Sequence, residues 1–190
     1  MTKTLLNPVE VYPENKLLIA GTAALVAGST AAYYAGGRFD GVIDFHLVQN
    51  VSWQIPFLDN VINTVSLLIF LYIAGYIINK RTRIIDILTT SLIARVPFYI
   101  LPLAGGSNIM RGLEAKSNPT NPDFLHFTTQ ETLVISVFAI FAIATLVWFI
   151  ILLYNGFKTA TNVKTLSHKF YFAIAVLFAE ILASILTSLI

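Results

Sequence analysis

The sequence contains no cysteine, so disulfide bonds, thiol catalysis and cysteine-ligated metal sites are excluded. Charged residues make up only 12% of the chain, whereas roughly a quarter of the residues of a soluble domain are charged. The formal net charge of +2 is too small to favour nucleic acid as a partner. No Gly-Ser-rich or Pro-rich linker divides the 190 residues, so we expect one domain over residues 1–190.

Hydrophobic residues are abundant instead, at 56% of the chain with a mean hydropathy of +0.76. A helix needs about 20 mostly apolar residues to cross roughly 30 Å of hydrocarbon. The first such run is longer than the apolar region of a signal peptide and follows a polar lead, so we expect it to be retained. The sequence predicts an all-α, polytopic membrane protein, a bundle of about five transmembrane helices. The spans cover residues 17–35, 61–78, 84–103, 132–153 and 170–190.

Lysine and arginine are distributed unequally between the two ends of these spans. The leading segment and the second and fourth connections carry eight of them: Lys3, Lys16, Lys80, Arg81, Arg83, Lys158, Lys164 and Lys169. The other two connections carry only Arg38, Arg111 and Lys116. Because basic loops stay in the cytosol, we expect a cytosolic N-terminus and a C-terminus outside. The basic cytosolic face either controls topology and attracts anionic lipid head groups or docks a cytosolic partner.

Two charged residues fall near the middle of predicted spans, Arg95 in the third and Glu180 in the fifth. At 1.5 Å per residue each lies about 15 Å from the cytosolic end of its helix. A lone charge at that depth costs about 2.5–3.5 kcal/mol or more. We therefore expect an intramembrane ion pair between Arg95 and Glu180.

Three interpretations of these charges stay open. The pair fixes the register of the two helices, or it forms a gated or proton-linked site. In the third, the two residues never meet, and Arg95 bonds to carbonyls freed by Pro97.

The first outer connection, residues 36–60, contains Phe39, Phe45, Trp53 and Phe57. Aromatic side chains favour the membrane interface, so we expect a short helix or half-strand lying on the surface. In the first span, Gly21 and Gly28 permit close packing of helices.

Other polar groups have the residue types of ligands but no supporting spacing. Asp40, Asp44 and His46 read as a solvated loop. Asp123 and His126 are three residues apart, and His168 heads the last span. Asp86 suits the first turn of the third helix, where the helix dipole stabilises an acid. Phosphate-loop, zincin and nucleophile-elbow motifs are absent, so we expect no catalytic residues, no metal and no cofactor.

An internal similarity links the second and third spans to the fourth and fifth. Residues 71–75, LYIAG, match residues 153–156, LYNG, and each is followed by a basic turn and a further span. Two hairpins of the same direction would form a parallel repeat, related by an axis near the membrane normal.

Two longer stretches suggest a family. They are RTRIIDILTTSLIARVPFYILPL at Arg81–Leu103 and LLYNGFKTATNVKTLSHKFYFAIAVLFAEIL at Leu152–Leu182. Over residues 60–190 the pattern resembles the Ypt-interacting-protein (Yip) membrane family in its bacterial form, which implies a bacterial inner membrane. Eukaryotic members bind prenylated Rab GTPases through a long N-terminal region that has no counterpart here. The resemblance therefore carries neither Rab binding nor catalytic residues to this chain.

These observations favour a Yip-type membrane scaffold or adaptor without catalytic activity. The alternative is a small transporter or channel with Arg95 and Glu180 as its site. A lipid-modifying enzyme is disfavoured because no convergent acid–base set appears. The expected partners are membrane lipid and a cytosolic or membrane protein, and the sequence leaves homo-oligomerisation open.

Overall fold

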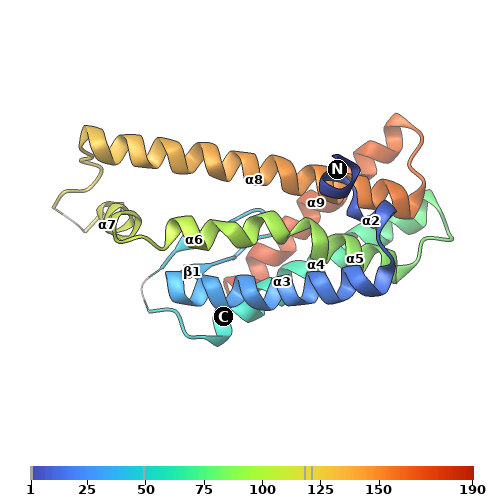
Figure 1. Ribbon diagram of the computed structural model, residues 1–190, viewed down its shortest axis with the longest axis horizontal. Helices are drawn as coiled ribbons and strands as arrows, with labels where there is room; N and C mark the ends of the chain where they lie inside the picture. The colour runs from blue at the N-terminus through green and yellow to red at the C-terminus, as the bar shows by residue number, and fades with distance from the viewer. Residues whose placement is uncertain (1, 49, 118, 121) are drawn as a thin grey trace.

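The computed structural model describes residues 2–48, 50–117, 119–120 and 122–190 and is an elongated all-α bundle (Figure 1). Five helical segments are long and apolar enough to cross a membrane. They are α3 (Glu14–Ala35), α4 (Gln54–Ile78), the broken segment Ile84–Gly105, α8 (Thr129–Thr161) and α9 (Leu166–Thr187). The predicted fold class is therefore confirmed.

Two predicted boundaries were wrong. Helix α4 begins at Gln54 rather than at residue 61, and its first two turns include Asp59 and Asn60, two polar residues that are buried inside the protein. Helix α8 continues to Thr161 rather than ending near residue 153, so Lys158 lies on its last turn and not in a loop. A capping box between Thr128 and Glu131 starts α8 by satisfying free backbone N–H groups.

The third span was expected to be one helix over residues 84–103, but it is interrupted in the middle, near Pro97. Helix α5 (Ile84–Ala94) ends at Arg95, a 3-10 turn η1 (Val96–Ile100) follows, and α6 (Leu101–Gly105) completes the crossing. Proline has no N–H to donate, so it cannot continue the hydrogen-bond ladder of α5. The break places the Arg95 side chain at the centre of the bundle, where it is fully buried.

Small residues bring the helices close together. A Cβ atom at Gly21 would collide with Leu92, and one at Gly28 would collide with the Tyr99 ring. These glycines therefore allow α3 to pack on the broken third span, as predicted. A third close approach joins α8 to α5, where Gly156 lies against Thr90.

The two helical hairpins α4–α5 and α8–α9 pack reciprocally. Helix α4 packs mainly on α9, and α5 packs mainly on α8. A two-fold axis along the bundle would produce this exchange of partners. The sequence repeat that would accompany such symmetry stays a prediction.

In the described part of the chain, three short helices lie outside the spans. Helices α1 (Thr2–Leu6) and α2 (Pro8–Val11) cover the end of α8, where the Trp148 Nε1 and Asn155 Nδ2 atoms donate to the Leu5 and Leu6 carbonyls at 3.0 and 2.8 Å. At the opposite end of the bundle, α7 (Asn108–Lys116) follows the third span. The N-terminal segment is thus attached to the bundle by side-chain hydrogen bonds.

Part of the connection between α3 and α4 is buried inside the bundle. Its strands β1 (Gly37–Arg38) and β2 (His46–Leu47) pair antiparallel, and the hairpin runs between the helices (Figure 1). Phe39 and Val42 are fully buried, whereas Trp53 is 59% exposed. The expectation of a surface segment was therefore wrong for the buried part of residues 36–48, which we name the central hairpin, whereas Ile43, Asp44 and His46 of this hairpin are exposed.

Candidate functional site

The predicted ion pair between Arg95 and Glu180 does not form. Arg95 Nη1 donates to the Val42 carbonyl at 2.8 Å, and the Ile43 N–H donates to Glu180 Oε2 at 3.0 Å. These two backbone groups belong to one peptide unit at the tip of the central hairpin. The buried charges therefore meet through a peptide group rather than directly.

Arg95 makes further contacts that explain its burial. Its Nη2 donates to Asn60 Oδ1 at 2.9 Å, and its guanidinium carbon lies 5.7 and 6.0 Å from the centroids of the Phe39 and Tyr99 rings. Cation–π attraction and hydrogen bonds offset the cost of taking the charge out of water. The interpretation that Arg95 bonds to a carbonyl was right in kind, but the carbonyl belongs to the hairpin and was not freed by Pro97.

Asn60 connects Arg95 to residues on α3 and α4. Its amide nitrogen donates to Ser29 Oγ at 2.9 Å and to the Pro56 carbonyl at 3.0 Å. With its oxygen on Arg95, this side chain connects α3, α4 and the break in the third span. Asn60, Ser29 and Arg95 are all fully buried.

A second charged pair holds the start of the hairpin. Arg38 donates to both carboxylate oxygens of Asp59, at 3.1 and 2.8 Å, and to the Thr187 carbonyl at 2.9 Å. The hydrogen bond and charge of Asp59 outweigh burial and raise the pKa of Arg38. Asp59 also accepts the Phe39 N–H at 3.3 Å. This pair ties the hairpin to the first turns of α4 and the last turn of α9.

Two backbone carbonyls of the hairpin receive side-chain donors as well. Asn63 Nδ2 donates to the Phe39 carbonyl at 2.6 Å, and Thr187 Oγ1 donates to the Asp40 carbonyl at 2.7 Å. A hairpin inside a bundle has no neighbouring strands or water to satisfy its backbone. We name the residues that do so, together with Arg38 and Asn60, which bond to two of them, the hairpin clamp: Arg38, Asp59, Asn60, Asn63, Arg95, Glu180 and Thr187.

Sequence reasoning identified Arg95 and Glu180 in the clamp but missed its members on α4. Asp59 and Asn60 were assigned to a loop because the second span was expected to begin at residue 61, and Asn63 fell inside that span without being singled out. Residues 59, 60, 63 and 64 are polar, and this i, i+1, i+4, i+5 spacing places them on one face of a helix. This polar face is the sequence pattern from which the clamp residues on α4 could have been predicted.

The predicted basic face lies at the end of the bundle opposite to α7. Lys80, Arg81, Arg83, Lys158, Lys164 and Lys169 are all exposed there. Arg83 is the most constrained, with Glu14 at 2.7 Å and Asp86 at 3.7 Å. Asp86 occupies the first turn of α5, as predicted. His168 accepts the Lys164 N–H on its ring nitrogen at 3.3 Å, in the first turn of α9.

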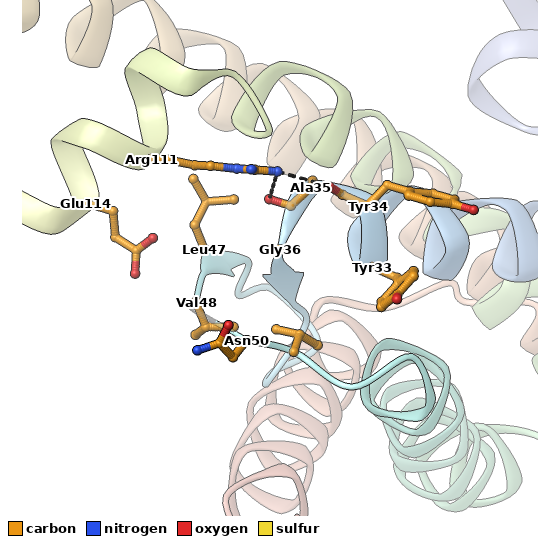
Figure 2. Close-up of a pocket in the computed structure, with 10 residues that line it drawn as sticks. Tyr33, Tyr34, Ala35, Gly36, Leu47, Val48, Asn50, Arg111 and Glu114 are labelled. Atoms are coloured by element: carbon orange, nitrogen blue, oxygen red, sulfur yellow. Dashed lines mark hydrogen bonds between the residues drawn. The ribbon is translucent and has the colours of Figure 1, made fainter.

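The hairpin end of the bundle has a pocket of about 570 Å³ between α3, β2 and α7 (Figure 2). Arg111 donates to the Tyr34 and Ala35 carbonyls at 3.0 and 3.4 Å and so caps the end of α3. Glu114 points into the same space from α7. Its pKa is raised because burial outweighs the opposing effect of His46.

The structure brings together three residues that the sequence left unconnected. Asp40, Asp44 and His46 place one ligand atom each within 4.8 Å of one another. His46 Nδ1 lies 2.8 Å from Asp40 Oδ1. The contact with Asp40 raises the pKa of His46. Burial alone would raise the pKa of Asp40, but the contact with His46 outweighs burial, and the pKa of Asp40 is lowered. By contrast, Asp123 and His126 occupy a turn in which the His126 N–H donates to the Asp123 carbonyl at 3.0 Å.

Comparison of the chain with known protein families, curated proteins and solved structures gave no match.

Proposed function

We propose that this chain is a non-catalytic, multi-pass membrane scaffold of Yip type, whose exposed basic end binds anionic lipid head groups and a protein partner. The observation that carries the proposal is the enclosure of Arg95 inside the bundle. Arg95 is fully buried between Phe39, Tyr99 and Asn60. A transport site needs a path for water or solute to its ionisable groups, and a side chain enclosed in this way favours a structural role.

The basic end supplies the interaction surface of the scaffold. Six exposed Lys and Arg side chains gather there, and each such charge near an anionic membrane surface contributes about 1 kcal/mol to attraction. The side of the membrane is part of the proposal: the basic end faces the cytosol of a bacterial inner membrane, and the C-terminus lies outside.

The lipid part can be tested on the full chain in nanodiscs that contain phosphatidylglycerol. Native mass spectrometry would count the retained anionic lipids for the wild type and for a triple variant, Lys158→Glu, Lys164→Glu and Lys169→Glu. We expect the triple variant to lose retained lipid, because repulsion replaces attraction. A matched variant with arginine at the same three positions keeps the charge and should behave as the wild type. Equal retention by all three proteins would contradict the proposal.

The alternative of a transporter is tested by flux through proteoliposomes. The scaffold predicts no proton or ion leak above that of empty vesicles, for the wild type and for Arg95→Lys alike. A leak that depends on the wild-type Arg95 would support the transporter and contradict the scaffold.

A further inference from the structure

The central hairpin gathers a set of metal-ligating side chains on one turn of chain. Asp40 follows β1, Asp44 lies in the tip, and His46 begins β2, so two carboxylates and one imidazole face a common point. Their ligand atoms lie within 4.8 Å of one another. Ligand atoms around a single ion at about 2.0–2.2 Å are separated by no more than roughly twice that distance. The observed spacing therefore needs only a small adjustment to enclose an ion.

One atom of the set, Asp40 Oδ1, would be stabilised by a positively charged partner. Asp40 Oδ1 is buried and, within the described residues, receives no hydrogen bond. It lies 2.8 Å from His46 Nδ1, so these two atoms are close enough to bind one ion together. A buried carboxylate oxygen without a donor is costly. An ion coordinated by both atoms would satisfy it.

The backbone that carries these ligands is fixed before any ion binds. Thr187 holds the carbonyl of Asp40 itself, while Arg95 and Glu180 hold the peptide group between Val42 and Ile43. In the β1–β2 pair, His46 stands opposite Arg38. Preorganised ligands lose little conformational freedom on binding, which increases affinity.

The surrounding charges also suit a cation. Arg38 would repel an ion, but it is paired with Asp59 through two hydrogen bonds. Glu114 on α7 lines the same groove as His46 and adds a third carboxylate to the neighbourhood. The groups that face the site are thus mainly anionic.

We propose that Asp40, Asp44 and His46 bind one divalent transition-metal ion, with Zn²⁺ as the best match. Imidazole and carboxylates are common zinc ligands, and three protein ligands leave a coordination position open. The proposal does not depend on the scaffold function, because a metal-loaded hairpin is compatible with either a scaffold or a transporter.

The test uses the full chain, purified in detergent and freed of metal by a chelator. Zn²⁺ alone would be titrated by calorimetry, and bound metal would be counted after dialysis. We expect one ion per chain. His46→Ala and Asp44→Asn should each weaken binding by more than the roughly 10–100-fold that loss of an outer-shell group costs.

A matched control is available on the second outer connection. His126→Ala removes a histidine that likewise lies close in sequence to an aspartate, Asp123, and it should leave Zn²⁺ affinity unchanged. Thermal unfolding of each variant without metal checks that the bundle is intact. The proposal is overturned if the wild type shows no saturable binding, or if a folded His46→Ala variant binds Zn²⁺ as tightly as the wild type.

Discussion

Arg95 and Glu180 hold opposite ends of one peptide group: Arg95 donates to the Val42 carbonyl, and Glu180 accepts the Ile43 N–H. The cation therefore acts as the donor to the carbonyl, and the carboxylate acts as the acceptor for the N–H. The arrangement predicts that exchanging the two residues does not restore stability, whereas a direct ion pair would survive the exchange.

The first prediction follows from this asymmetry. Arg95→Glu would set a carboxylate against a carbonyl, and Glu180→Arg would set a donor against an N–H. The double variant should therefore be at least as unstable as either single variant, because an unsatisfied buried group costs about 1–3 kcal/mol and more when charged. Unfolding temperatures in detergent measure this. Glu180→Gln, which keeps an acceptor oxygen, is the matched control and should lose less. Recovery in the double variant would show that the side chains pair directly.

The second prediction concerns the pair at the start of the hairpin. Asp59→Ala removes the partner of a largely buried Arg38, whose side chain is 19% exposed. Hydrogen bonds to charged groups contribute about 1.5–3 kcal/mol, and we expect a loss of that size in the free energy of unfolding. The control is Glu10→Ala at the exposed Lys3–Glu10 pair, which should cost less than about 1 kcal/mol. Equal effects would mean that the hairpin is not held by Asp59.

The third prediction compares two glycines. A Cβ atom at Gly28 would meet the Tyr99 ring, whereas one at Gly112 on α7 meets nothing within 4 Å. Gly28→Ala should destabilise by about 1–3 kcal/mol through overpacking. Gly112→Ala should be neutral or stabilise by up to about 1 kcal/mol, because alanine favours a helix. If Gly28→Ala is neutral, α3 does not pack on η1 as closely as described.

The five spans could be predicted from the sequence because membrane helices depend on local composition and length. The break at Pro97 was not predicted, although the missing N–H of proline is a local signal for it. The central hairpin could not be predicted, because Phe39 suits a buried site as well as the membrane interface. What decides between them is the set of donors and acceptors on other helices, such as Asn63 and Thr187, which the chain brings near only after folding.

The ion pair was mispredicted for a related reason. Similar depth in the membrane placed Arg95 and Glu180 at one level, but depth alone does not say what lies between two helices. Here a peptide group of the hairpin lies between them. The Asp40–Asp44–His46 set was also beyond reach, since its convergence depends on the β1–β2 pairing.

The insertion of the hairpin into the bundle is the central claim, and the lack of native cysteine makes it directly measurable. Single cysteines would be placed at Val42, which is fully buried, and at Ser52, which is exposed in the same connection. The variants would be treated with a membrane-impermeant maleimide in intact membranes and after denaturation. We predict rapid labelling of Ser52→Cys and labelling of Val42→Cys only after denaturation. Labelling of both positions at the same rate in intact membranes would contradict the account and place the connection on the surface.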